Sequence, residues 1–213
     1  MEKKLSYIFK KSVKNIYIVR HPEVENFKQS VFNGSIDVDL SKEGYKEANN
    51  LYNFFKNKNI KTVFSSPMKR CKIVSEQFRE TAEIIYDDRI KERNFGIFET
   101  LSWETIEMRY KDESKRFLDD PFYYKVKGGE SFYDVENRVV DFIDDRLRNL
   151  SKDVLIVAHG GVNRIFIANF LAMDRKSILS LSQDYACINH FQTDGDFMLA
   201  KLINGASNCD RCF

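Results

Sequence analysis

Two of the three histidines in the 213-residue chain stand where apolar, β-type runs end. His21 closes the run that begins at Ile16, and His159 closes the run that begins at Val154. Short runs rich in valine and isoleucine are typical of buried strands in a mostly parallel sheet, whose ligands bind beyond the carboxyl ends of the strands. Arg20, directly before His21, adds a fixed positive charge that suits a phosphate or a carboxylate. The pattern therefore predicts a cleft for phosphate chemistry that holds both histidines.

A third apolar run, 61–65, ends in the pair Ser65-Ser66, and Arg70 follows one helical turn later. Taken alone, Arg70 would be an ordinary surface charge, and a single histidine at a strand end is more often a satisfied polar residue than a catalyst. Polar residues placed independently of one another, however, have no reason to fall at the same end of three strands. Their convergence favours an anion site.

Phosphoryl transfer needs an in-line nucleophile, cations around the equatorial oxygens and a proton donor for the leaving oxygen. A neutral imidazole can attack phosphorus directly, so either His21 or His159 could be the nucleophile. Arg20 and Arg70 would supply bidentate contacts. Gly160 would let a backbone N–H approach the phosphate at a helix start.

The elements that position these residues alternate between strand and helix. Strands are predicted at 16–21, 61–65, 84–86, 154–158, 186–192 and 197–203, and helices at 103–110, 131–150 and 163–171, after Ser41, and after Ser66-Pro67. Ser41 and Ser66 are the predicted N-caps of the first two helices, with Pro67 at a first helical position. A turn at Asp194-Gly195 joins the last two strands as a hairpin. This order predicts an α/β fold with a mostly parallel sheet.

Composition narrows the class of protein. The chain is 43% hydrophobic and 31% charged with a net charge of +2, which gives no electrostatic case for nucleic acid. No apolar stretch approaches the roughly 20 residues that span a bilayer, and the first ten residues have too short an apolar core for a signal peptide. We therefore expect a cytoplasmic protein with no membrane partner.

The length favours one domain. We expect a basic N-terminal extension at 1–15, a single domain at 16–204 and a C-terminal tail at 205–213, with an aromatic-rich insertion at about 97–127. Cys209 and Cys212 have a redox- or metal-like spacing, but they stand without a second pair of ligands, so a frayed tail is the preferred interpretation. No metal site and no cofactor are predicted.

Eight motifs, in register over most of the chain, resemble those of the histidine phosphatase superfamily, which includes the cofactor-dependent phosphoglycerate mutases. They are Val19-Arg-His-Pro-Glu-Val-Glu-Asn26, Phe32-Asn-Gly34, Asp37-Val-Asp-Leu40, Gly44, Ser65-Ser-Pro-Met-Lys-Arg70, Glu92-Arg-Asn-Phe-Gly-Ile-Phe-Glu99, Gly128-Gly-Glu-Ser131 and Ala158-His-Gly160. The late motif Tyr185-Ala-Cys-Ile-Asn189 resembles the α-ribazole phosphatase and broad-specificity phosphatase branch of that superfamily. The resemblance implies a phosphoglycerate mutase-like, three-layer α/β/α sandwich.

The resemblance also implies roles for individual residues. His21 would be the phosphorylated nucleophile, and Arg20, Arg70 and His159 would form the phosphate pocket. Glu92 would donate the proton to the leaving alcohol, for which burial or the bound phosphate would have to raise its pKa. The alternative is that the Glu92 carboxylate only pairs with a neighbouring basic side chain in solvent. The implied substrate-binding set is Arg20, Asn26, Asn33, Gly34, Arg70 and Gly160.

Four positions depart from the family pattern. Pro22 replaces the usual Gly, Val24 replaces the usual Thr, Asn26 sits one place before the familiar Asn, and Thr100 stands where Gly is common. The Thr hydroxyl that would touch phosphate is therefore missing, although the charged groups that dominate the electrostatics remain. We expect slower or differently selective catalysis.

The segment between Glu92 and Gly128 is shorter than in the mutases, which favours the α-ribazole phosphatase and broad-specificity phosphatase branch. We expect a phosphomonoesterase acting on a small phosphorylated metabolite, with α-ribazole phosphate as one candidate. A phosphoglycerate mutase-type transferase and a non-catalytic phospholigand-binding protein are the alternatives, and a homodimer is left open. The insertion aromatics Trp103, Tyr110, Phe117 and Phe122 would stack on a ring-bearing substrate or pack the insertion onto the sheet. His190 is interpreted as structural.

Overall fold

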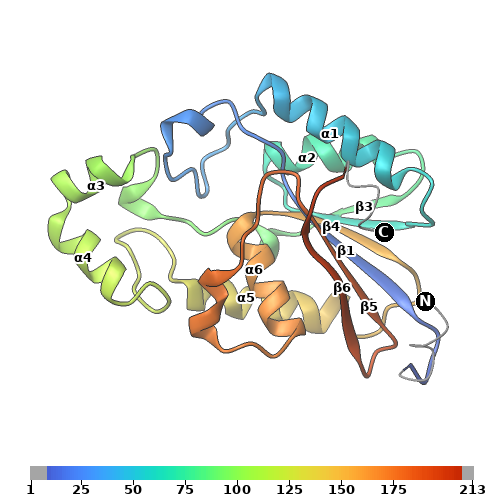
Figure 1. The fold of residues 1–213 in the computed structure, drawn as a ribbon. Helices are drawn as coiled ribbons and strands as arrows, with labels where there is room; N and C mark the ends of the chain where they lie inside the picture. Colours follow the sequence, from blue (N-terminus) through green and yellow to red (C-terminus); the bar gives the residue numbers. More distant parts are fainter. Residues whose placement is uncertain (1–8, 208–213) are drawn as a thin grey trace.

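Six strands form one mixed sheet in the computed structural model, which describes residues 9–207 (Figure 1). The strands are β1 (Lys14–Arg20), β2 (Thr62–Ser65), β3 (Glu83–Tyr86), β4 (Val154–Ala158), β5 (Ile188–Thr193) and β6 (Met198–Gly205). Their order is β3-β2-β4-β1-β5-β6. The first four are parallel, and β5 and β6 are antiparallel to their neighbours. The predicted mostly parallel sheet is confirmed.

Helices cover both faces of the sheet, which makes the three layers (Figure 1). The helices are α1 (Lys42–Phe55) and α2 (Lys69–Ser75) on one face, and α5 (Phe132–Arg146) and α6 (Gly160–Phe170) on the other. Successive side chains of a strand point to opposite faces. Ile16 and Ile18 accordingly pack with α5 and α6, whereas Tyr17 and Val19 pack with α1 and α2. Burying a side chain of this size stabilises the fold by about 2 kcal/mol.

The caps of the first two helices differ from each other. The Oγ of Ser41 accepts a hydrogen bond from the Gly44 N–H at 3.0 Å, so the predicted N-cap of α1 is confirmed. The predicted N-cap of α2 is wrong, because that helix begins at Lys69 with Met68 as its N-cap residue. The Ser66 hydroxyl lies 2.8 Å from a ring nitrogen of His159 instead.

Other predicted boundaries shift by a few residues. A capping box between Ser131 and Asp134 starts α5, which ends at Arg146 rather than at 150. The helix predicted at 163–171 begins at Gly160. The chain also forms short 3-10 helices: η2 (Phe27–Gln29), η3 (Glu76–Phe78), η4 (Asp88–Ile90), η5 (Gly96–Phe98) and η6 (Arg175–Ser180).

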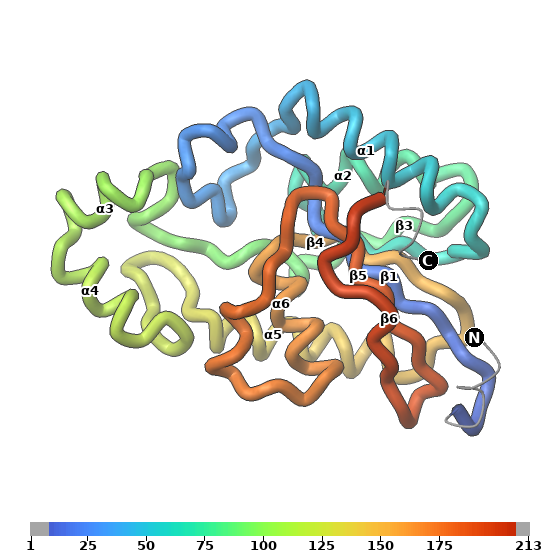
Figure 2. Tube along the Cα trace, viewed as in Figure 1, coloured from blue at the N-terminus to red at the C-terminus, as the bar shows by residue number. Residues whose placement is uncertain are grey.

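The predicted insertion forms a lobe beyond the carboxyl ends of the parallel strands (Figure 2). It contains α3 (Trp103–Arg109) and α4 (Lys111–Asp119). Trp103, Tyr110 and Phe117 pack around the lobe's own buried residues, Phe98, Ile106 and Val126. Phe122 instead joins the core between the sheet, α5 and α6. Three of the four insertion aromatics therefore build a separate small core rather than packing on the sheet.

The first described residues pack against the β5–β6 hairpin. The Lys10 N–H donates to the Asp194 carboxylate at 2.7 Å, and Lys11 forms an ion pair with Asp196 at 2.9 Å. β1 begins at Lys14, two residues before the predicted start.

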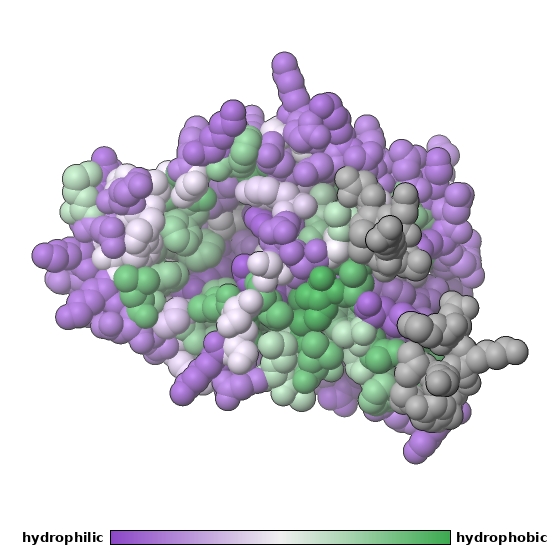
Figure 3. All heavy atoms as spheres, viewed as in Figure 1, coloured by the Kyte–Doolittle hydropathy of each residue, from purple (hydrophilic) through white to green (hydrophobic). Residues whose placement is uncertain are grey.

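Cys209 and Cys212 lie outside the described residues. Apolar side chains gather in the middle of the face seen in Figure 3, where α6 and β6 lie. Within residues 9–207, no helix is long and apolar enough to cross a membrane.

Thr100 holds a backbone conformation that favours glycine. Its φ is +66°, and its N–H donates to the Phe32 carbonyl at 2.8 Å. A left-handed conformation costs a residue with a Cβ about 1–2 kcal/mol, and the Thr100 side chain is exposed, so little packing offsets this cost. The departure from the family's Gly is thus a point of strain.

We expect Thr100→Gly to raise the free energy of unfolding by about 1 kcal/mol, measured by urea denaturation. The same substitution at Thr105, inside α3, serves as the control. It should lower the free energy of unfolding by roughly 0.5 kcal/mol, because glycine is a poorer helix former than threonine. Equal signs for the two variants would contradict the strain at Thr100.

Candidate active site

The carboxyl ends of β1, β2 and β4 bring the predicted polar residues together. The rings of His21 and His159 lie edge to face with their centroids 5.2 Å apart. Ser66, after β2, lies beside His159. Neighbouring parallel strands end at the same edge of the sheet, so residues far apart in the chain meet there.

A cavity of about 170 Å³ opens at this edge. It is lined by Arg20, His21, Val31, Phe32, Asn33, Gly34, Arg70, Glu92, Phe95 and Tyr185. Six of the predicted site residues are therefore on its wall. The other three, Asn26, His159 and Gly160, do not line it. None of the four predicted insertion aromatics lines it.

The ring of His21 is oriented by a backbone carbonyl. Nδ1 lies 2.8 Å from the carbonyl oxygen of Pro22, which can only accept a hydrogen bond. Nδ1 therefore carries the proton in the neutral ring, and Nε2 keeps its lone pair. Burial, followed by the charges of Arg70 and Arg20, holds the pKa of His21 well below its usual value. His21 is thus a neutral imidazole with a free nucleophilic nitrogen.

His159 is completely buried behind His21. Its Nε2 lies 2.8 Å from the Ser66 hydroxyl and 3.5 Å from the Cys71 sulfur. Burial, followed by the charge of Arg70, keeps the pKa of His159 well below its usual value. Burial also raises the pKa of the Cys71 thiol to about 12, so this neighbour stays neutral.

Both site arginines donate to backbone carbonyls, and the Nε of each has no partner in the protein. Arg70 donates from Nη2 to Gly34 and from Nη1 to Ile36, each at 2.7 Å. Arg20 donates from Nη1 to the Gln183 carbonyl at 2.5 Å. Within residues 9–207, the buried side-chain nitrogens without an acceptor in the protein are the Nε atoms of these two arginines. Both side chains also line the small cavity, so an anion bound there would lie against two guanidinium groups.

Glu92 faces the amino end of α6. Its carboxylate accepts hydrogen bonds from the backbone N–H groups of Gly161 at 3.1 Å and of Arg93 at 2.9 Å. A Cβ on Gly161 would lie 2.5 Å from Glu92 Oε1, so this contact depends on glycine. The carboxylate is held by these backbone groups and lines the cavity, unlike the alternative of a solvent pair with a neighbouring side chain.

Asn26 and Asn33 bind each other. Each side-chain amide donates to the other's oxygen, at 2.7 and 3.0 Å, so Asn26 holds the side chain of the cavity residue Asn33 in place. Gly160 packs closely against Arg20, because a Cβ on Gly160 would lie 3.4 Å from Arg20 Nε. Val24, which stands in place of the family's Thr, is buried in the core with α1 and bridges to Leu40.

Sequence reasoning missed the contribution of the segment before β5. The ring of Tyr185 lies 4.0 Å from the Arg20 guanidinium and lines the cavity, and the Gln183 carbonyl binds Arg20. The Gln183 amide exchanges hydrogen bonds with that of Asn189 at 2.9 Å in both directions, which fixes the segment. The motif that begins at Tyr185 was the available signal, but the sequence alone does not bring it to β1.

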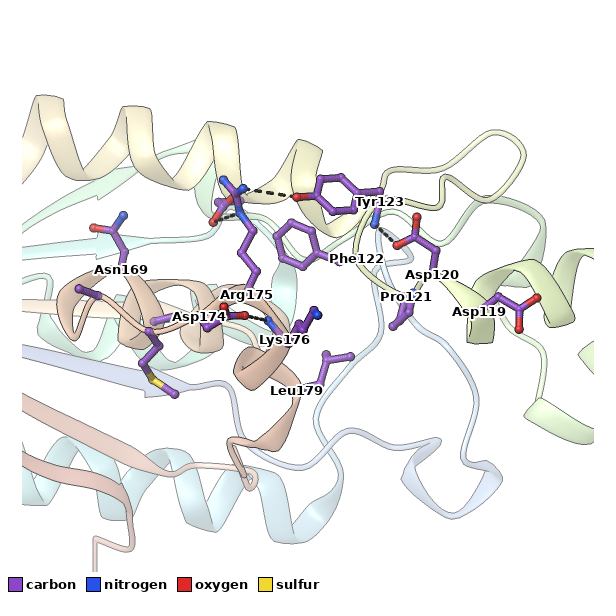
Figure 4. A pocket seen from close by; sticks show the side chains of 14 residues that line it. Asp119, Asp120, Pro121, Phe122, Tyr123, Asn169, Asp174, Arg175, Lys176 and Leu179 are labelled. Carbon is purple, nitrogen blue, oxygen red and sulfur yellow. Dashed lines mark hydrogen bonds and ion pairs between the residues drawn. The ribbon is translucent and has the colours of Figure 1, made fainter.

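A larger cavity of about 960 Å³ lies elsewhere, between the end of the insertion and the segment after α6 (Figure 4). Arg175 reaches across it to the carboxylate of Glu136 at 2.9 Å and approaches the Tyr123 hydroxyl at 3.4 Å. None of the predicted site residues lines this cavity. No cluster of three or more His, Cys, Asp or Glu side chains that could hold a metal ion occurs in residues 9–207.

The depressed pKa values of the histidines predict a pH dependence of stability. A histidine that is neutral in the folded chain takes up a proton on unfolding once the pH falls below about 6.5, so stability is lost as the pH drops. We expect the free energy of unfolding to fall by about 1.4 kcal/mol per pH unit for each such histidine between pH 6 and 5. In urea titrations at several pH values, His159→Gln should lower the slope of the free energy of unfolding against pH by about 1.4 kcal/mol per pH unit, which is the contribution of one proton. An unchanged slope would contradict the buried neutral state of His159.

Comparison with known proteins decides the family. The family model described as "Histidine phosphatase superfamily (branch 1)" matches residues 16–205. The chain belongs to the histidine phosphatase superfamily. The resemblance inferred from the motifs and the phosphoglycerate mutase-like α/β fold are both confirmed.

Several known proteins are similar over most of this chain. Phosphoserine phosphatase 1 of Hydrogenobacter thermophilus is 29% identical over 174 residues, which are 80% of this chain and 82% of the relative. 6-phosphofructo-2-kinase/fructose-2,6-bisphosphatase 3 of Rattus norvegicus is 32% identical over 162 residues, 74% of this chain but 28% of that protein. The α-ribazole phosphatase of Shigella flexneri has the same fold, with a TM-score of 0.84 at 20% identity over 90% of this chain and 96% of that one. This histidine phosphatase is therefore an enzyme of the phosphatase class.

Proposed function

We propose that the protein is a phosphomonoesterase that hydrolyses a small phosphorylated metabolite through a phosphohistidine on His21. The observation that carries this proposal is the pair of arginines, Arg20 and Arg70, that line the small cavity beside an imidazole whose Nε2 keeps its lone pair. The two cations bind and neutralise the phosphoryl oxygens, and the neutral ring is ready to attack.

In the first step His21 Nε2 attacks phosphorus and the bond to the leaving alcohol oxygen breaks. Arg20 and Arg70 stabilise the charge on the equatorial oxygens of the transferring group. His159, behind His21, supports the pocket on the side of β4. Glu92, in its protonated form, gives its proton to the leaving oxygen.

In the second step water attacks the phosphohistidine. Glu92, now a carboxylate, takes a proton from that water, and the N–P bond breaks to release inorganic phosphate. Neutral His21 and protonated Glu92 are thereby restored. The hydrogen bond from Nδ1 to the Pro22 carbonyl keeps Nε2 directed at phosphorus in both steps.

The identity of the substrate's alcohol portion is the more specific part of the proposal. The cavity of about 170 Å³ is small compared with typical ligand pockets, which favours a compact ester or one whose alcohol extends into solvent. O-phosphoserine is a candidate because of the relative named phosphoserine phosphatase 1. α-Ribazole phosphate, a candidate from the motifs, is the second.

Activity of the purified protein tests the proposal. We expect release of inorganic phosphate from p-nitrophenyl phosphate in EDTA, and from one or more members of a panel with O-phosphoserine, α-ribazole phosphate, phosphoglycerates and sugar phosphates. Isomerisation of a phosphoglycerate without phosphate release would favour the mutase alternative. Tight phosphate binding without turnover of any ester would favour the non-catalytic alternative.

A further inference from the structure

The position of Arg70 depends on a short surface segment, 33–36. Two of its carbonyl groups, those of Gly34 and Ile36, each accept a hydrogen bond from the Arg70 guanidinium at 2.7 Å. Arg70 is 1% exposed and lines the small cavity, and its Nε has no acceptor in the protein. Where these carbonyls lie therefore decides where the guanidinium lies.

The carboxylate of Glu99 holds this segment. Glu99 Oε1 accepts hydrogen bonds from the Ser35 N–H at 2.7 Å and from the Ser35 hydroxyl at 2.8 Å. The same oxygen accepts from the Phe95 N–H at 3.1 Å. One ionised oxygen thus joins the segment that holds Arg70 to the segment that begins with Glu92, and hydrogen bonds to a charged acceptor are the stronger kind.

Close packing adds to these bonds. Gly34 has a φ of +45°, and a Cβ on it would lie 2.3 Å from Glu99 Oε1 and 2.8 Å from the Arg93 carbonyl oxygen. The Glu99 carboxylate therefore rests directly on the Gly34 backbone. On the other side, the Asp37 carboxylate accepts from the Lys69 N–H at 2.7 Å, at the start of the helix that carries Arg70.

We propose that Glu99 is a positioning residue of the phosphate site: it fixes the Gly34 and Ile36 carbonyls and, through them, holds the Arg70 guanidinium at the wall of the small cavity. The role rests on the proposed function in so far as it takes the cavity for a phosphate pocket. It does not depend on hydrolysis, since it concerns binding of the anion.

Titration calorimetry with inorganic phosphate tests this role. Glu99→Gln keeps the size of the side chain and removes its charge, and it should raise the Kd for phosphate about tenfold. Arg70→Lys should raise the Kd by at least as much. Since Glu99 acts through Arg70, the double variant should bind phosphate no more weakly than Arg70→Lys alone. Glu136→Gln, which removes a carboxylate at the distant larger cavity, should leave the Kd unchanged.

Three outcomes would overturn the role of Glu99: a wild-type Kd in Glu99→Gln, additive effects in the double variant, or an equal loss of affinity in Glu136→Gln. If Glu99→Gln does not fold, Ser35→Ala removes one donor to the same oxygen and should raise the Kd severalfold. Failure of the proposed function has a different signature. In that case the Kd for phosphate changes in the variants as predicted above, but the protein hydrolyses no ester.

Discussion

Replacing His21 with alanine is expected to lower kcat for p-nitrophenyl phosphate by about 10⁴-fold or more. The substitution removes the atom that forms the bond to phosphorus, and loss of a nucleophile leaves only the residual catalysis of binding and charge stabilisation. Arg20 and Arg70 remain, so the variant should still bind inorganic phosphate. The measurement is steady-state hydrolysis in EDTA together with phosphate binding by calorimetry.

His190→Ala is the matched control for that experiment. His190 is half-buried on β5, where its ring stacks on Tyr17 and its Nε2 lies 2.8 Å from the Asn15 side chain. It does not line the small cavity, so its removal should change kcat less than about threefold beyond any loss of folded protein. Equal turnover by His21→Ala and the wild type would rule out His21 as the nucleophile.

Glu92→Gln is expected to separate good from poor leaving groups. A proton donor is needed when the leaving alkoxide is strongly basic and is hardly needed for p-nitrophenolate, and general acid catalysis contributes about 10²–10⁴-fold. We expect kcat to fall about 10²-fold or more for glycerol phosphate and less than about tenfold for p-nitrophenyl phosphate. The N–H groups of Arg93 and Gly161 bind different oxygens of Glu92, and the single oxygen of glutamine can accept from only one of them. The fraction of folded variant is therefore measured together with the rates.

The control for this experiment is Glu113→Gln. Glu113 binds the Tyr124 hydroxyl in the insertion lobe and does not line the small cavity. Glu113→Gln should lower the rates with both esters only slightly and by the same factor. If Glu92→Gln slows both esters by the same factor, Glu92 is not the proton donor, even where overall activity is lost.

Most of the site follows from local sequence signals. Arg20-His21, Ser65-Ser66 and His159-Gly160 each follow an apolar run, and the ends of parallel strands must meet. The sheet, its flanking helices and the meeting of the two histidines could therefore be predicted. A serine before a proline matches the pattern of a helix N-cap, so the sequence predicts that role for Ser66. In the structure the Ser66 hydroxyl instead contacts His159, which follows a different strand.

The contribution of Tyr185 and Gln183 could not be predicted, because it depends on how two distant strands pair. β5 runs antiparallel to β1, with Ile188 opposite Val19, so the amino end of β5 lies beside the carboxyl end of β1. This pairing brings the segment before β5 onto Arg20. A hydrophobic pattern predicts that a strand exists but does not give its neighbour or its direction.

The formation of phosphohistidine at His21 can be tested most directly by trapping it. The enzyme would be mixed with excess p-nitrophenyl phosphate, quenched within milliseconds in alkaline denaturant, in which the N–P bond survives, and digested for peptide mass spectrometry. We expect the mass of one phosphoryl group on the peptide that contains His21, at a level that decays once substrate is consumed, and none in His21→Ala. Phosphorylation of another residue, or steady turnover with His21 unmodified at every quench time, would contradict the covalent mechanism.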